Sequence, residues 1–325
     1  MKLATKKSNS KDGTLIVVSK DNKKAIEATG IAASLREAME DWANIKPQLE
    51  VLYKKLNEGE LTNSFVVDKQ SLHSPMPRTF QWADGSAFIH HIKLVRQARG
   101  AALPETLATV PLMYQGGGDN FIAPTEDILQ IDPSHGTDFE GEVGVIVNDV
   151  PMGITPQEAL NHIQLIVLIN DVSLRGLIPN ELKAGFGFFH GKPSSSFAPF
   201  ALTPSELGSA WKEGRVHLPL LVEYNGEFFG KANASAMHFH FGELIAHAAK
   251  TRNLTAGTII GSGTVSNEDM AMGSSCLAEK RMLEKIHEGV IKTAFMNNGD
   301  QIKIEMKNEA GENLFGTINQ KVRKI

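Results

Sequence analysis

The chain has 325 residues, of which 42% are hydrophobic and 22% are charged, as in an ordinary folded globular protein. This length predicts one sizeable domain with a smaller one beside it. The formal net charge of −4 gives no reason to expect a nucleic acid or an anionic membrane as a partner. The single cysteine, Cys276, excludes an intramolecular disulfide and suits a reducing cytosol. The first residues lack the apolar stretch of a signal peptide, and the most apolar run, 163–169, is too short to cross a bilayer. We therefore expect a soluble, cytoplasmic protein.

The first part of the chain predicts a small α/β domain. A strand is expected over 14–19 and an amphipathic helix over 33–57, and Pro47 is expected to kink or divide that helix. A polar stretch with two prolines follows at 68–78 and is typical of a domain link. We place the small domain at 1–75 and a second domain at 76–325.

The second domain is predicted to be rich in strands with helices between them. Asn225-Gly226 is a two-residue hairpin turn signal. Many short strands with helices placed irregularly between them predict an α+β fold with a curled mixed sheet. The sequence contains no phosphate-binding glycine motif that would indicate nucleotide binding. The expected strands are 142–147, 165–169, 218–224, 227–231, 258–264, 301–306 and 314–319, and the expected helices are 87–99, 155–163 and 241–251.

An acidic strand is the most informative local pattern. In the run 138–147, Glu140 and Glu142 precede or enter an apolar strand with one residue between them. Alternate residues of a strand share a face, so the two carboxylates would lie side by side and would repel each other without a cation between them. Mg²⁺ and Ca²⁺ prefer such oxygen ligands. Taken alone, these residues favour a solvent-facing strand edge over a metal site.

Two further segments carry candidate polar residues. The predicted buried strand 165–169 is followed by Asp171 and, four residues later, by Arg175. The residues alone also allow Asp171 to be a helix or turn cap. Lys192 lies in a loop rich in glycine, serine and aromatic residues, where a lysine is suited to lie beside an anion.

A histidine pair marks the predicted helix at 87–99. His91 shares a face with apolar neighbours, so it should point inward, and adjacent His90 must point elsewhere. A core histidine would show the same pattern, and Asp84, seven residues earlier, could be the helix N-cap. Cys276 is interpreted as a small buried thiol and not as a nucleophile.

Together these residues resemble the fumarylacetoacetate hydrolase family, over roughly residue 77 to the C-terminus. The segments that carry the resemblance are 138–142, 170–175, Gly191-Lys192 with the serines after it, and 261–266. Residues 1–75 look like the small lead domain of bacterial members. The spacing of Asp84 and His91 is similar to that of the true fumarylacetoacetases within the family. One departure is Ile178, which stands where the eukaryotic enzymes have a substrate-contacting glutamine.

The resemblance implies a role for each candidate residue. It implies a β-rich, curled catalytic domain, a divalent metal (Mg²⁺ or Ca²⁺, with Mn²⁺ as a further candidate), a small dicarbonyl acid as substrate and a homodimer. The implied metal ligands are Asp84, Glu140, Glu142, Asp171, Ser195 and Ser196; the implied catalytic residues are His91, Glu279, Lys192 and Arg175; and the implied substrate contacts are Tyr114, Thr264, Arg175 and Lys192.

The expected activity is hydrolysis of a carbon–carbon bond. Fumarylacetoacetate, an intermediate of phenylalanine and tyrosine catabolism, is the expected substrate. Acylpyruvate hydrolysis, oxaloacetate decarboxylation and hydratase or isomerase chemistry on a 2-oxo acid are alternatives on the same scaffold. A binding protein that has kept the fold without catalysis is a further alternative.

Overall fold

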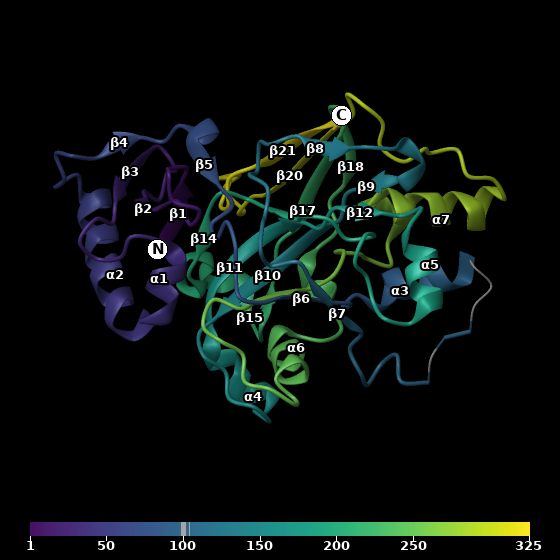
Figure 1. Cartoon of the computed structure of the whole chain (residues 1–325), viewed down its shortest axis with the longest axis horizontal. Coiled ribbons are helices and arrows are strands. Elements are labelled where there is room, and N and C mark those ends of the chain that lie inside the picture. The colour runs from purple at the N-terminus through teal and green to yellow at the C-terminus, as the bar shows by residue number, and fades with distance from the viewer. Residues whose placement is uncertain (99–101, 104) are drawn as a thin grey trace.

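The computed structural model describes residues 1–98, 102–103 and 105–325, so the last residue of the expected helix 87–99 lies outside the described part. Two sheets organise this part of the chain (Figure 1). The larger one has the order β4 (Phe65–Val66), β3 (Lys24–Glu27), β2 (Thr14–Val18), β1 (Lys2–Lys6), β14 (Ala201–Leu202), β11 (Ile163–Asn170), β10 (Gly141–Val147), β19 (Ile259–Gly261), β6 (Trp82–Gly85) and β7 (Met113–Gly116), with β5 (Leu72–His73) beside β1 and β13 (Ser196–Phe197) beside β11.

The second sheet and two short ladders complete the β structure. The second sheet has the order β18 (Glu227–Gly230), β17 (Leu220–Tyr224), β20 (Gln301–Met306), β21 (Ile318–Lys324) and β8 (Ile128–Gln130). The ladders are β9 (Thr137–Asp138) with β12 (Ser173–Leu174), and β15 (Trp211–Lys212) with β16 (Arg215–Val216). The pairs β19–β6 and β21–β8 are parallel, and the others described above are antiparallel, so the sheets are mixed as expected.

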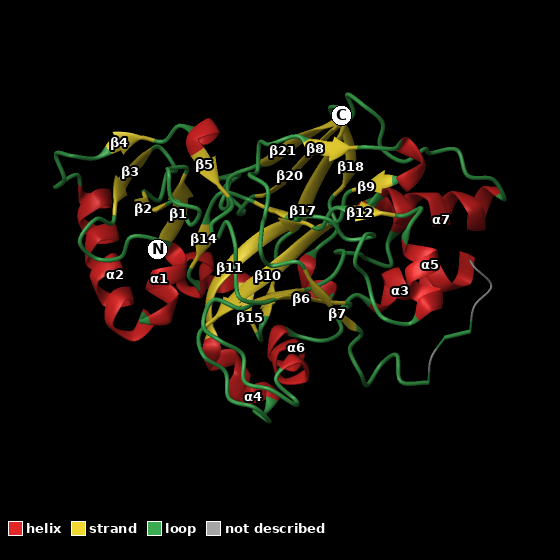
Figure 2. Cartoon of the chain, viewed as in Figure 1, coloured by secondary structure: helices red, strands yellow, loops and turns green. Residues whose placement is uncertain are grey.

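The helices lie around the sheets in three groups (Figure 2). Helices α1 (Leu35–Glu40) and α2 (Trp42–Glu58) pack at one end of the molecule beside β1–β3. Helices α4 (Pro156–Ala159) and α6 (Phe241–Ala248) pack together, and α3 (Ile89–Ala98), α5 (Ile178–Ala184) and α7 (Leu277–Glu288) gather at the end opposite α1 and α2. Short 3₁₀ turns are η1 (Lys69–Ser71), η2 (Pro133–His135), η3 (Leu160–His162), η4 (Pro204–Ala210), η5 (Ala234–Ala236) and η6 (Met270–Met272).

Strands β10 and β11 form the centre of the larger sheet because they are apolar on both faces. Leu165, Val167 and Ile169 enter one buried cluster together with side chains of the N-terminal strands. Ile166 and Leu168 enter the other cluster. A strand that is covered on both sides reads as a continuous apolar run, which is the pattern of 163–169. The strand β1 then pairs with β14, so the N-terminal strands extend this same sheet.

Several expected elements differ from the observed ones. The helix expected over 33–57 is divided at Asp41, where the backbone leaves helical geometry, and α2 continues through Pro47. The expected division at Pro47 is therefore wrong; Leu49 and Leu56 of α2 are buried, and this packing holds the helix across the missing hydrogen bond. The strand expected at 314–319 begins only at Ile318, because Leu314 and Phe315 enter the core from a loop.

Other elements are shorter than expected or were not predicted. The strand expected at 258–264 is limited to β19, and the helix expected at 155–163 is one α-helical turn followed by η3. The hairpin at Asn225-Gly226 is confirmed, with positive φ at both turn residues. Helices α5 and α7 were not predicted. No helix in the described ranges is long and apolar enough to cross a membrane.

Candidate active site

Three carboxylates from separate strands meet at one edge of the central sheet. Asp84 is the next-to-last residue of β6, Glu142 lies in β10, and Asp171 follows β11. Pairing places Glu142 opposite Ile169 and Asp84 beside Gly261 of β19, which brings the three side chains to the same place. One oxygen from each lies within 4.8 Å of the others, and all three residues are buried.

These three residues fit a divalent cation. Both carboxylate oxygens of Glu142 are buried, and neither has a hydrogen-bond partner in the described part of the chain. Burial, and after it the neighbouring acidic charges, raise the pKa of Glu142 and of Asp84 well above the ordinary carboxyl value. Burying like charges together is costly unless a positive charge compensates them. A hard cation with oxygen ligands supplies that charge, so Asp84, Glu142 and Asp171 are suited to hold one.

Lys192 and Arg175 bring positive charge to the same site. The Nζ of Lys192 donates to Glu140 Oε2 and to Asp171 Oδ2, each at 2.6 Å. Arg175 donates through Nη2 to Glu140 Oε1 at 2.6 Å. Burial acts to lower the pKa of Lys192, but the charges of Asp171 and Glu140 outweigh it and raise that pKa. Burial likewise acts to raise the pKa of Glu140, and the Arg175 and Lys192 charges hold it below its ordinary range.

Glu140 therefore occupies a different position from the other expected ligands. It precedes β10 and belongs to a second group of potential ligand atoms, with His91 and Cys276. Its two oxygens are both engaged by cationic side chains. Glu140 as described is thus an anion that positions Arg175 and Lys192, and its role as a metal ligand stays a prediction.

Two of the hydroxyl groups predicted for the site, those of Tyr114 and Ser195, donate hydrogen bonds to Asp171, and that of Ser196 does not. Tyr114 donates its hydroxyl hydrogen to Asp171 Oδ2 at 2.8 Å, and Ser195 donates to Asp171 Oδ1 at 2.7 Å. Asp171 is therefore fixed by a tyrosine, a serine and a lysine together. The Oγ of Ser196 is buried and has no hydrogen-bond partner in the described ranges. The backbone of Ser196 belongs to β13, which pairs with β11.

His91 and Glu279 form a hydrogen-bonded pair across two helices. The Nδ1 of His91 on α3 lies 2.8 Å from Glu279 Oε2 on α7. Glu279 is buried, and its backbone N–H donates to the Sγ of Cys276, which caps the start of α7. Burial raises the pKa of the Cys276 thiol well above its ordinary value, so this side chain is suited to packing and not to nucleophilic attack. Glu279 thus engages Nδ1 of His91, and no hydrogen bond is described for Nε2 within residues 1–98, 102–103 and 105–325.

A cavity of about 370 Å³ connects these groups. It is lined at one end by predicted site residues: Asp84, His91, Tyr114, Glu140, Arg175, Lys192 and Thr264. The remaining wall is largely apolar and comes from Ile92, Val95, Leu112, Ile178, Leu182 and Phe188, with Arg96, Ser86 and Gly263 beside them. Glu142, Asp171, Ser195, Ser196 and Glu279 are not part of the lining, and all of them are buried.

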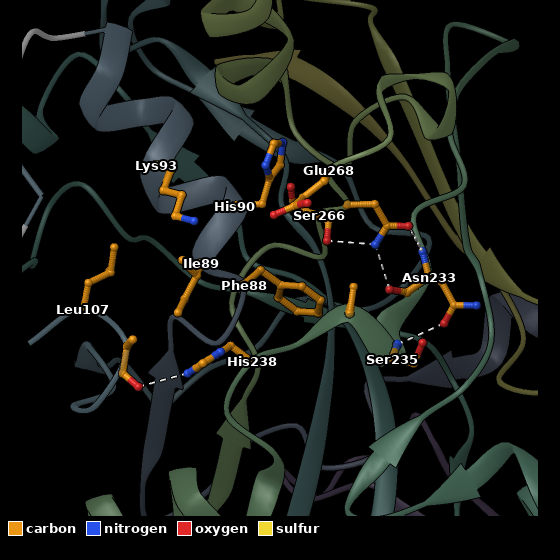
Figure 3. Close-up of a pocket in the computed structure, with 13 residues that line it drawn as sticks. Phe88, Ile89, His90, Lys93, Leu107, Asn233, Ser235, His238, Ser266 and Glu268 are labelled. Carbon is orange, nitrogen blue, oxygen red and sulfur yellow. Dashed lines mark hydrogen bonds between the residues drawn. The ribbon is translucent and has the colours of Figure 1, made fainter.

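A second cavity, of about 710 Å³, shows where the neighbouring histidine points. His90 lies there with Lys93 of the same helix, opposite Ser266 and Glu268 (Figure 3). His90 is thus on another face of α3 from His91, as adjacent helical residues must be. None of the acidic trio lines this larger cavity, whereas Asp84 lines the smaller one.

Asp138 is a site residue that the sequence reasoning missed. It is fully buried and accepts hydrogen bonds from Arg175 Nε at 2.9 Å and from the backbone N–H groups of Leu277 and Ala278 at 2.8 and 2.9 Å. Asp138 thereby caps the start of α7 and holds Arg175 at once. Its place in the acidic run 138–142 was visible in the sequence, but the partner helix α7 was not predicted.

The backbone turn that contains Gly261 and Gly263 lies very close to the Asp84 carboxylate. The N–H of Gly263 donates to Asp84 Oδ1 at 3.0 Å. Gly263 has φ +75°, and a Cβ at Gly261 would lie only 2.3 Å from Asp84 Oδ1. The glycines of the segment 261–266 are therefore needed for the close approach of this turn to the carboxylate.

Comparison with known proteins gives matches over nearly the whole chain. Residues 81–323 match the family model "Fumarylacetoacetate (FAA) hydrolase C-terminal", and residues 1–78 match "Fumarylacetoacetase N-terminal domain 2". The oxaloacetate tautomerase YisK of Bacillus subtilis is 25% identical over 299 residues, which are 90% of this chain and 89% of the relative.

Solved structures share the fold over the whole chain. A fumarylacetoacetate hydrolase from Exiguobacterium antarcticum superposes with a TM-score of 0.65 at 16% identity, covering 100% of both chains. A maleylpyruvate hydrolase from Sphingobium sp. SYK-6, solved in complex with manganese(II) and pyruvate, superposes with a TM-score of 0.65 at 16% identity, covering 100% of this chain and 99% of the other. The two family models together span nearly every residue, and the chain therefore belongs to the fumarylacetoacetate hydrolase family.

Proposed function

We propose that the chain is a divalent-metal-dependent hydrolase that cleaves a carbon–carbon bond in a dicarbonyl acid, with fumarylacetoacetate as the first substrate to test. The observation that carries this proposal is the His91–Glu279 pair at 2.8 Å, facing a cavity that also contains Lys192, Arg175 and the Asp84 carboxylate. A base that is oriented by a buried carboxylate is what activation of water requires.

The proposed reaction begins with water and His91. The Nε2 of His91 removes a proton from water, and the resulting hydroxide forms a bond to one carbonyl carbon of the substrate. Glu279 holds the imidazole ring and stabilises its protonated form. The bond from that carbon to the adjacent carbon then breaks, and the electron pair remains on the departing fragment as an enolate. The proton held by His91 returns to that fragment, which completes one acid and one methyl ketone or related product.

The cationic side chains stabilise the charges that develop. Lys192 and Arg175 line the cavity and are already paired with Glu140, so they are fixed before the substrate arrives. Preorganised donors of this kind stabilise an oxyanion without rearrangement. Tyr114 and Thr264 are proposed to contact the substrate, since both line the same wall. The departing enolate would lie nearest Lys192.

The proposed metal is Mg²⁺ or Ca²⁺, with Mn²⁺ as a further candidate. Asp84, Glu142 and Asp171 would hold it, and Glu140, Ser195 and Ser196 are proposed as additional ligands or as partners of its waters. When bound, the cation would polarise the substrate carbonyls as a Lewis acid. An oxygen-only ligand set favours these hard ions over zinc. A cytoplasmic location and a homodimer belong to the same proposal.

A second candidate function is tautomerisation of oxaloacetate. It is favoured by the oxaloacetate tautomerase YisK, which matches nine-tenths of this chain. Such a reaction moves a proton within a four-carbon acid and adds no water. The long apolar wall formed by Ile178, Leu182 and Phe188 would then have no substrate group to contact, which supports a larger substrate. Acylpyruvate hydrolysis, oxaloacetate decarboxylation and 2-oxo acid hydratase or isomerase chemistry remain in the panel to be tested.

The deciding experiment is a substrate panel with and without metal. Fumarylacetoacetate, an acylpyruvate and oxaloacetate are each incubated with the purified protein after chelation and after addition of Mg²⁺, Ca²⁺ or Mn²⁺. Hydrolysis releases two acids, whereas tautomerisation changes only the keto–enol ratio. We expect metal-dependent release of two products and a loss of about 10²–10⁴-fold in His91→Ala, with metal binding retained. Metal-dependent keto–enol exchange without cleavage of any dicarbonyl acid would instead establish the second candidate.

A further inference from the structure

Arg281 is an arginine beside the active site that forms no ion pair with an acidic side chain in the described part of the chain. It lies on α7, where its guanidinium carbon is 4.1 Å from the centre of the Phe295 ring and its Nη1 donates to the carbonyl oxygen of Thr293. No carboxylate of the described residues forms an ion pair with it, and its Nε is buried without an acceptor. Arg175, by contrast, forms ion pairs with Asp138 and Glu140. A half-buried guanidinium in this state is suited to bind an anion.

Arg281 lines a further cavity that adjoins the active-site cavity. It lines a cavity of about 260 Å³ together with Ala278, Met282 and Phe295. This cavity shares Arg175, Val95 and Ile178 with the active-site cavity, so the two adjoin each other. Its lining contains two arginines and no acidic residue. The charge of Arg175 is already compensated by Asp138 and Glu140, so Arg281 is the lining residue whose charge is available to attract an anionic group.

We propose that Arg281 binds the distal carboxylate of a dicarboxylic substrate whose dicarbonyl part lies at the acidic trio. This inference rests on the proposed function and adds the residue that recognises the second carboxylate of the substrate. The apolar side chains of Val95 and Ile178 lie where the two cavities meet, and they would contact the carbon chain between the two ends of the substrate. Ile178 has no polar side-chain atom, whereas Arg281 lines the adjoining cavity with a buried Nε that has no acceptor among the described residues.

Arg96 provides the matched control. It lines the active-site cavity from α3, and its Nη1 donates to the carbonyl oxygen of Ala102 at 2.8 Å. Arg96 therefore has the same charge and also lies beside the active-site cavity, but it does not line the cavity of Arg281. If a distal carboxylate is recognised at Arg96, the proposal for Arg281 is wrong.

The test uses two acylpyruvates of equal chain length, one ending in a carboxylate and the other in a methyl group. The metal-loaded protein is compared with Arg281→Met, Arg281→Lys and Arg96→Met. We expect the ratio of kcat/KM for the diacid over the monoacid to fall by about 10- to 100-fold in Arg281→Met, through KM, and to be partly restored in Arg281→Lys. Arg96→Met should leave this ratio within about twofold. Thermal unfolding of each variant verifies the fold.

Other outcomes are equally decisive. A ratio near one in the unmodified protein, or an equal loss on both substrates in Arg281→Met, would overturn the role of Arg281 and leave the hydrolase proposal intact. If neither acylpyruvate is cleaved, binding of adipate against hexanoate by calorimetry tests Arg281 instead; the hydrolase proposal fails if fumarylacetoacetate is left intact as well. A preference for adipate that disappears in Arg281→Met supports the anion site; equal binding of the two acids excludes it.

Discussion

Substitution of Gly261 by alanine tests whether Asp84 is a metal ligand without changing any polar group. A Cβ at this position would lie 2.3 Å from Asp84 Oδ1 and 2.5 Å from the Trp82 ring. Ordinary contact begins at 3.4 Å, so the carboxylate must retreat by about 1 Å (3.4 − 2.3 = 1.1 Å). Trp82 is buried and has little room to yield. Overpacking of this kind costs about 1–3 kcal/mol of folding stability.

The functional consequence should exceed the loss of stability. A displacement of about 1 Å in a reacting site can cost about 10²-fold in rate. We expect Gly261→Ala to weaken Mg²⁺ or Mn²⁺ binding by about 10- to 100-fold in calorimetric titration and to lower turnover accordingly. Gly117→Ala is the control, because its new Cβ would meet only the end of the Asp119 side chain, at 3.3 Å. Unchanged metal affinity in a folded Gly261→Ala protein would show that Asp84 is not a ligand.

Three further predictions concern other parts of the molecule. Glu279→Gln should lower kcat by about 10²–10⁴-fold and leave metal affinity unchanged, since it removes the carboxylate that orients His91; equal loss of metal binding would contradict this. Cys276→Ser should keep near-normal turnover, because the thiol only caps α7; abolished turnover in a folded variant would restore the nucleophile interpretation. Asp12→Asn should cost about 1–2 kcal/mol in urea unfolding at neutral pH, because Arg78 lowers the pKa of Asp12 from 3.8 to about 2. Since that pKa is lowered on folding, this difference from the unmodified protein is present above about pH 4 and should vanish as the pH falls towards 2; a difference that persists at pH 2 would refute the assignment.

The central part of the fold could be predicted from local pattern. The run 163–169 is apolar at every position but one and is bounded by polar residues, so its burial on both faces follows from the sequence. The hairpin at Asn225-Gly226 is also a local property. By contrast, α7 has polar and charged residues at most positions, and only Leu277 and Glu279 are buried in it. Its position depends on Asp138, more than a hundred residues away, which no local pattern reveals.

In the candidate site, too, some residues could be predicted from local sequence pattern and others depend on tertiary contacts. The carboxylates Glu142 and Asp171 could be proposed because each stands on or directly after an apolar strand. The different environment of Glu140 could not, because it depends on Arg175 and Lys192 approaching from other segments. Spacing along a strand shows which residues share a face, but the pairing of charges depends on tertiary contacts.

The double engagement of Asp138 has a consequence for how this site can change over time. One buried carboxylate holds both the arginine that lines the cavity and the first turn of the helix that carries Glu279 and Arg281. A substitution at Asp138 would therefore disturb Arg175 and, through α7, the positions of Glu279 and Arg281 at the same time. Substrate preference can change more easily at Ile178 or Leu182, because their side chains line the cavity and hold no other site residue by a hydrogen bond. Positions 138 and 175 should accordingly vary together among relatives, while 178 and 182 vary on their own.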